Sequence, residues 1–220
     1  MMFSAFLPVF FTVFIVVDPI GLVPLYIGLT SHIPRERRKG IIRKAVFISF
    51  GVLVFFVVLG NHILGLLRID PGAFFIAGGI MLFIISLDML FGRPSKSKVS
   101  EREQSEPPSG SGGGDEGVSV AVFPLAIPML AGPGTITAII LFTGRGDVNP
   151  LVMTGMLLVS LAAVMGIVWA ALSASDFILR FLGETGVSVF ERIMGLLLSG
   201  MSVQFVYDGI VRLGLIPGAL

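Results

Sequence analysis

Two stretches decide the fold of this 220-residue chain: FSAFLPVFFTVFIVVDPIGLVPLYIGL at residues 3–29 and VSVAVFPLAIPMLAGPGTITAIILF at residues 118–142. Each is long enough to span a bilayer, which takes about 20 mostly apolar residues. Each is interrupted near its middle by Gly, Pro and acidic or hydroxyl residues, at 18–24 and 131–137. A proline inside a helix costs about 3 kcal/mol, and irregular backbone at membrane depth persists only inside protein or beside a cavity. The interruptions therefore predict two broken spans that build a binding site.

The composition is that of an integral membrane protein. Hydrophobic residues make up 55% of the chain, charged residues only 13%, and the mean hydropathy is +0.98, whereas soluble domains carry about 25% charged residues. The first charged residue is Asp18, so the first apolar run lacks the basic start of a cleaved signal and is expected to be a retained span. The absence of cysteine excludes disulfides, thiol catalysis and cysteine-bound metal. His32 and His62 lie too far apart in the sequence to suggest a metal site.

The apolar runs predict an all-α fold with six spans, at about 3–30, 42–66, 71–91, 118–143, 150–173 and 190–212. Between the third and fourth spans, residues 92–117 have the Ser- and Gly-rich composition of a flexible linker. We therefore expect one membrane domain made of two three-span halves, residues 1–91 and 118–220.

The two halves carry similar signals in the same order. Gly21 is followed nine residues later by Thr30, and Gly134 is followed nine residues later by Thr143. Because each half has an odd number of spans, the second half must enter the membrane from the opposite side. The sequence thus predicts an inverted repeat, a plan common among transporters.

Positive charge alternates between the connections and predicts the orientation. Twelve of the fifteen Lys and Arg residues fall in the first, third and fifth connections, and three lie on the opposite side: Arg68, Arg145 and Arg212. Cytoplasmic loops carry the excess of positive charge. We therefore expect a multi-pass protein of the cell membrane, with the linker in the cytoplasm and both termini outside it.

The interruptions suggest how a ligand would be held. Each starts a half-helix whose free N–H groups and dipole point toward the midplane, where they can hold a carboxylate. Glycines leave their amides uncovered, and threonine hydroxyls can cap the helix or bond the ligand. The predicted substrate-binding residues are Asp18, Pro19, Gly21, Gly132, Pro133, Gly134, Thr135 and Thr137.

Asp18 has three possible roles. An ionised carboxylate at mid-bilayer costs about 2.5–3.5 kcal/mol, so a compensating interaction is expected. It can bind a substrate ammonium, carry a coupling proton, or cap the half-helix that follows Pro19. Packing kinks remain the alternative explanation for the prolines and glycines as a group.

Three motifs resemble the MarC family, also called the small neutral amino acid transporter family. They are DPIGLVP at 18–24, IAGGIMLF at 76–83 and PLAIPMLAGPGTIT at 124–137, and the resemblance extends over nearly the whole chain outside the linker. It implies six spans, transport of small neutral amino acids such as glycine and alanine in at least some members, and proton coupling. The chain departs from the expected pattern at Phe75, where an arginine is expected before Ile76.

The leading hypothesis is a secondary transporter, a proton symporter for small neutral amino acids, in which the half-helix N-termini hold the substrate carboxylate. A passive channel or facilitator of the same fold, or a membrane protein without transport activity, are the alternatives. An enzyme is not expected. Within the predicted spans His62 is the only histidine and Asp18 is the only carboxylate deep in the apolar core, so the sequence suggests no nucleophile–base pair. No cofactor is expected, and the lipid bilayer is the surrounding partner.

Overall fold

The computed structural model describes residues 2–31, 33–92, 121–143 and 149–215, and all secondary structure in these ranges is helical. Among the described residues, five helical segments are long and apolar enough to cross a membrane: Phe6–Thr30, Arg35–Leu66, Pro71–Leu90, Pro150–Ser173 and Thr185–Arg212. The prediction of an all-helical fold is thereby confirmed for the described residues. The predicted linker 92–117 lies almost wholly outside the described residues.

The first and fourth predicted spans each contain two helices. Residues 3–30 form α1 (Met2–Val17) and α2 (Leu22–Thr30). Residues 121–143 form the π-helix η1 (Ala121–Leu130) and α7 (Pro133–Thr143). The α7 segment is a shorter apolar helix and is not among the five candidate spans.

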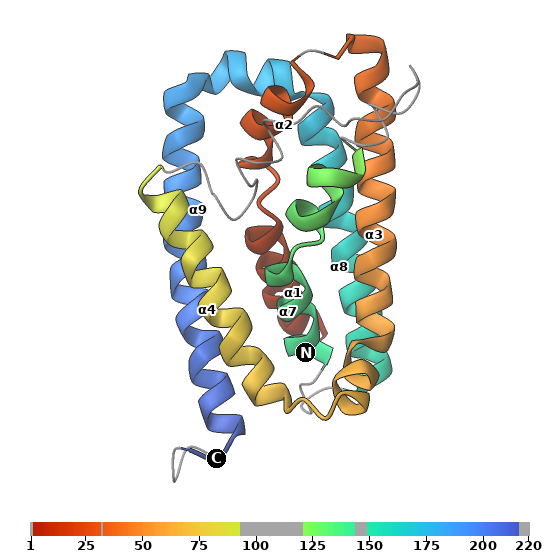
Figure 1. Cartoon of the computed structure of the whole chain (residues 1–220), viewed down its shortest axis with the longest axis vertical. Coiled ribbons are helices and arrows are strands. Elements are labelled where there is room, and N and C mark those ends of the chain that lie inside the picture. Colours follow the sequence, from red (N-terminus) through yellow and green to blue (C-terminus); the bar gives the residue numbers. More distant parts are fainter. Residues whose placement is uncertain (1, 32, 93–120, 144–148, 216–220) are drawn as a thin grey trace.

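The other four predicted spans each lie within one helix; the bounds of the third and fifth agree closely with those expected, whereas the second begins seven residues earlier and the sixth fifteen residues earlier. These helices are α3 (Arg35–Leu66), α4 (Pro71–Leu90), α8 (Pro150–Ser173) and α9 (Ser175–Arg212). In Figure 1, α4 and α9 form one side of the molecule and α3 and α8 the other, with α1 and α7 between them. Helix α1 begins and α9 ends at the lower end of this view, and α3 begins at the upper end.

Helices α4 and α8 start with the same local structure, an N-terminal side-chain cap followed by a proline. The Asp70 carboxylate accepts a 2.7 Å hydrogen bond from the Gly72 N–H, and Pro71 is the first residue of α4. The Asn149 side chain accepts a 3.0 Å bond from Leu151, and Pro150 begins α8. An Asx cap satisfies an orphan amide, and proline fits the first helical position because its missing N–H would be unbonded there.

The π-helix η1 ends in a wide turn. At its end, Ala131 donates to the Ala126 carbonyl, five residues back, at 2.9 Å. Such wide turns are rare and occur often at functional sites.

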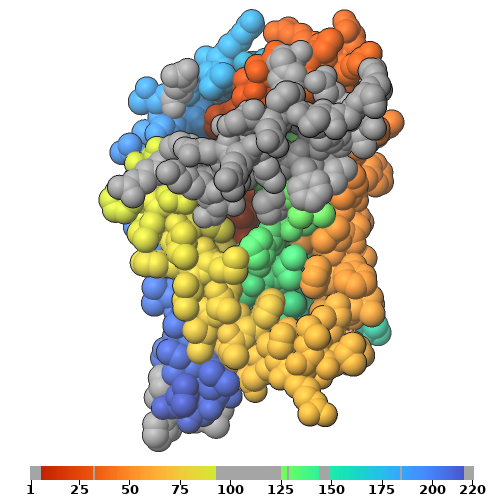
Figure 2. Space-filling model, in the orientation of Figure 1, coloured from red at the N-terminus to blue at the C-terminus, as the bar shows by residue number. Residues whose placement is uncertain are grey.

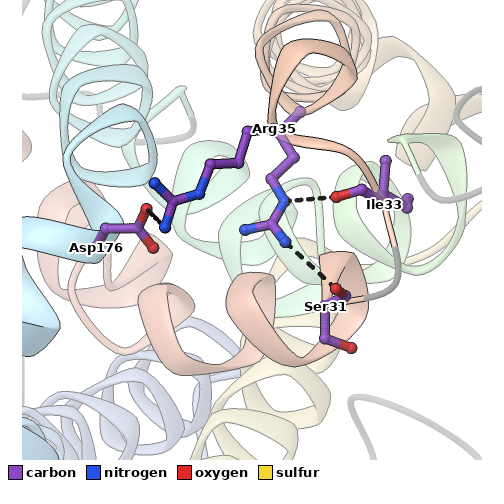
Figure 3. Close-up of polar contacts among 5 residues, drawn as sticks. Ser31, Ile33, Arg35 and Asp176 are labelled. Carbon is purple, nitrogen blue, oxygen red and sulfur yellow. Dashed lines mark hydrogen bonds and ion pairs between the residues drawn. The ribbon is translucent and has the colours of Figure 1, made fainter.

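Helix α9 bends sharply at Gly183, whose φ of 66° is the left-handed conformation that favours glycine. The segment before the bend crosses the upper end of the molecule in Figure 1. It is tied to the start of α3 by an ion pair of 3.3 Å between Arg35 and Asp176 (Figure 3). Arg38 donates to the carbonyls of Ile33 and Ser31 and so holds the α2–α3 turn.

Helices α4 and α9 meet along a seam of small residues. A Cβ on Gly72 would lie 2.8 Å from the Gly209 carbonyl oxygen, and a Cβ on Gly79 would lie 2.8 Å from that of Ser202. Farther along, a Cβ on Gly195 would lie 3.1 Å from the Ser86 carbonyl oxygen. The small residues recur every seven positions on each helix, in opposite directions, so the two backbones approach closely over several turns.

Candidate functional site

Asp18 sits where α1 gives way to α2, in an unusual conformation. Its φ is 48°, its side chain is 3% exposed, and its N–H still donates to the Phe14 carbonyl at 2.9 Å. Positive φ is uncommon outside glycine but is enriched in Asp and Asn. The chain therefore leaves the helix at a buried carboxylate rather than at a glycine.

The carboxylate of Asp18 folds back over the start of α2. Its Oδ1 accepts a 3.2 Å hydrogen bond from the Gly21 N–H, and a Cβ on Gly21 would collide with Oδ2. The next two amides are engaged as well, because Leu22 donates to the Asp18 carbonyl and Val23 to that of Ile20. The first amides of α2 are thus used within the protein and are not directed at a ligand.

The start of α7 differs from that of α2. Pro133 is its first residue, and Ile136 donates to the Gly132 carbonyl at 3.0 Å. The amides of Gly134 and Thr135 belong to the first turn, which offers no intrahelical acceptor for them. The Thr135 hydroxyl donates to the Leu130 carbonyl at 3.3 Å, across the gap between η1 and α7.

A cavity of about 170 Å³ joins these two regions. Asp18 and the end of α1 form one wall, residues 132–135 form a second, and α4 supplies a third through apolar side chains that include Met81 and Leu82. In Figure 2, part of α1 is visible at the bottom of a hollow between α4 and the green segment that holds α7. The lining is mainly apolar, and Asp18 and Thr135 are its residues with polar side chains.

The predicted site residues divide between the cavity and its supports. The cavity is lined by Asp18, Gly132, Pro133, Gly134 and Thr135. Outside the lining lie the buried Pro19, Gly21 beneath the carboxylate, and Thr137.

Thr137 supports the site from behind. Its hydroxyl donates to the Pro133 carbonyl at 2.8 Å, and its side chain fills the space that a Cβ on Gly78 would need. It thus holds the first turn of α7 against α4. The binding roles of all eight residues stay predictions.

Sequence reasoning did not single out the apolar walls. Leu82 packs against Gly134, where a Cβ would strike its Cδ2, and Met129, Met89 and Leu198 complete the lining with neighbouring residues. These side chains resemble lipid-facing ones in the sequence, so only their position identifies them. Within the described ranges, no three His, Cys, Asp or Glu side chains lie close enough to hold a metal ion.

Comparison with known proteins agrees with this architecture. The family model described as "MarC family integral membrane protein" matches residues 3–213. A UPF0056 membrane protein of Methanocaldococcus jannaschii is 38% identical over 93% of this chain and 86% of its own length. The protein YvbG of Bacillus subtilis, with the same family designation, is 33% identical over 96% of both chains.

A third relative, from Archaeoglobus fulgidus, is 37% identical over 95% of this chain and 93% of its own. No solved structure matches. The match to the family model over nearly the entire sequence, together with these relatives, identifies the chain as a member of the MarC family of integral membrane proteins.

Proposed function

We propose that the protein is a secondary transporter of small neutral amino acids of the glycine and alanine class, and that it is a proton symporter. The observation that carries this proposal is the cavity that Asp18 and the first turn of α7 line together. The ammonium of a zwitterionic amino acid can pair with the Asp18 carboxylate, and its carboxylate can bind the amides of the first turn of α7.

The transporter would have six spans arranged as two inverted three-span repeats. Spans one and four would be broken near the bilayer midplane, at Asp18–Gly21 and at Ala131–Gly132. The helix bounds on either side of these residues support this arrangement, as does the position of both gaps near mid-height in Figure 1. The seam between α4 and α9 supports it too, because an inverted repeat places the third and sixth spans antiparallel across its axis.

The size of the cavity favours a very small substrate. An engineered cavity of about 150 Å³ in another protein holds benzene, a molecule of six non-hydrogen atoms. Alanine also has six, so a volume of about 170 Å³ accommodates alanine but not leucine or phenylalanine without rearrangement. The Leu82 and Met81 side chains would set this limit from α4.

The polar groups favour one orientation of the substrate. The Asp18 carboxylate would accept hydrogen bonds from the ammonium, and the Gly134 and Thr135 amides would bond the carboxylate at the positive end of α7. The first amides of α2 already donate hydrogen bonds within the protein. The substrate carboxylate would therefore be bound by the α7 amides alone rather than by both half-helices. Because a symporter carries the proton together with the substrate, the coupling proton would reside on the Asp18 carboxyl while its remaining lone pairs accept from the ammonium.

Transport would proceed by alternating access, with one repeat rocking against the other around the cavity. The charge asymmetry between the two ends supports a cell-membrane orientation with the basic end in the cytoplasm and both termini outside. Backbone strain at Asp18, with φ at 48°, is consistent with a functional constraint at that residue.

Ligand-induced thermal stabilisation of the purified protein tests the binding step. Glycine, alanine and serine should raise the melting temperature, and leucine and phenylalanine at the same concentration should not. Saturable alanine uptake into proteoliposomes, stimulated by an inward proton gradient, tests the coupling. Uptake that neither saturates nor responds to the gradient would indicate a passive facilitator, and the absence of both binding and uptake would contradict the proposal.

A further inference from the structure

A second hollow lies between α3 and α8, which run side by side (Figure 1). It is a groove of about 470 Å³ that shares no lining residue with the cavity at Asp18. Helix α3 contributes Val46, Phe47 and Phe50, and α8 contributes Met165, Gly166 and Trp169. On each helix these residues recur at the three- and four-residue spacing of one helical face, so two apolar faces form a single trough.

The groove is open on the outer surface of the helix bundle. Phe47 is 70% exposed and Trp169 is 52% exposed, and both belong to helices that qualify as membrane spans. At Gly166 a Cβ would meet nothing within 4 Å, so this glycine leaves an unfilled floor between the aromatic walls. In a bilayer such a surface faces acyl chains rather than water.

One end of the groove is cationic. Arg43 lines it, one helical turn before Val46. Arg43 belongs to a cluster of six basic residues in the first ten residues of α3, where Glu36 is the one acidic residue. Arg37, Lys39, Arg43 and Lys44 from this cluster are exposed. Guanidinium groups bind phosphate through paired hydrogen bonds, and basic pockets between spans bind anionic lipid headgroups.

We propose that this groove binds one anionic phospholipid, with its phosphate at Arg43 and an acyl chain lying along Phe47, Phe50 and Gly166. From Arg43 to Phe50 the groove runs seven residues along α3, about 10 Å at 1.5 Å per residue. That covers about two thirds of one leaflet's hydrocarbon layer of roughly 15 Å. Trp169 then stands near the level where tryptophans concentrate at membrane interfaces.

The test uses Trp169, the single tryptophan of the chain, as a reporter inside the groove. The protein is reconstituted into phosphatidylcholine vesicles that contain increasing fractions of brominated phosphatidylglycerol or brominated phosphatidylcholine, because bromine quenches indole fluorescence on contact. The brominated anionic lipid should reach half-quenching at a mole fraction about fivefold lower, the factor expected from one basic contact near a membrane surface.

Two pairs of variants separate the groove from general attraction to a charged surface. Arg43→Gln should remove the preference for the anionic lipid, whereas Arg37→Gln, which removes the same charge from the same cluster outside the groove, should keep it. Gly166→Leu fills the floor and should abolish the preference. Gly155→Leu is its control, because Gly155 is also in α8 and also has open space at its Cβ position.

Three results would overturn the proposal. The first is equal quenching by the two lipids in the unaltered protein. The second is a preference that survives both Arg43→Gln and Gly166→Leu. The third is Trp169 fluorescence that neither lipid quenches in a protein that cross-links as a dimer, because a second copy of the chain would then cover the groove.

Discussion

Replacing Asp18 with asparagine tests the proposed substrate contact with little disturbance of the fold. Asparagine keeps an oxygen that can accept the 3.2 Å hydrogen bond from the Gly21 N–H, and it tolerates the positive φ of 48° at this position. A hydrogen bond to a charged acceptor is worth about 1.5–3 kcal/mol and a neutral one about 1 kcal/mol. The variant should therefore lose no more than about 1–2 kcal/mol of stability from the weaker cap.

The effect of Asp18→Asn on binding should be larger, because Asp18, which lines the cavity, loses its charge. Loss of a charge-assisted bond to the ammonium, about 1.5–3 kcal/mol, corresponds to an affinity for alanine about 10- to 150-fold weaker. Proton-stimulated uptake should disappear, because the amide does not titrate. Equilibrium binding of labelled alanine and uptake into proteoliposomes with and without a proton gradient measure the two effects.

The control for this experiment is Asp88→Asn, which removes a carboxylate of α4 that does not line the cavity. It should leave both binding and uptake close to those of the unaltered protein. If Asp18→Asn itself bound alanine within about threefold of the original affinity and kept its response to the proton gradient, Asp18 would have no part in recognition or coupling.

Three further outcomes are expected. Gly134→Leu should abolish alanine-induced thermal stabilisation because its side chain enters the cavity; stabilisation by alanine in this variant would place the site elsewhere. Gly79→Leu should destabilise the protein by about 3 kcal/mol, the upper range for overpacking, in thermal unfolding. The same change at Gly200, where a Cβ meets nothing within 4 Å, should have little effect; equal effects would count against a close seam. Arg35→Gln should cost about 0–1 kcal/mol, since the ion pair with Asp176 is exposed; a larger loss would mean that this contact holds the upper end together.

The apolar runs predicted most of the helices because length and hydropathy identify a span without any knowledge of its neighbours. The bend at Gly183 was not predicted, and residues 175–182 were left within a connection. They are helical, and Phe177 and Phe181 stack on one exposed face at a ring distance of 6.2 Å. A short amphipathic segment at the end of a bundle lacks the continuous apolar run that identifies a span.

The glycines and prolines of the site were readable from the sequence because they are costly inside a helix. Their separate roles were not. Whether the Gly21 amide faces a ligand or the Asp18 carboxylate depends on a side-chain direction, and whether Leu82 lines a cavity or faces lipid depends on the packing of α4. Phe75, the departure from the family pattern, lies under the Arg212 guanidinium at 4.7 Å from its ring centroid, so α9 brings a cation to this position.

The seam between α4 and α9 has a consequence for biosynthesis. The glycine face of α4 finds its partner only after α9 has been translated, roughly 120 residues later, which takes on the order of ten seconds at ribosomal speed. During that interval the first four helices, α1 to α4, lack the partner that covers the glycine face of α4. The surface that α4 presents is therefore completed only by α9, the last described helix to leave the ribosome.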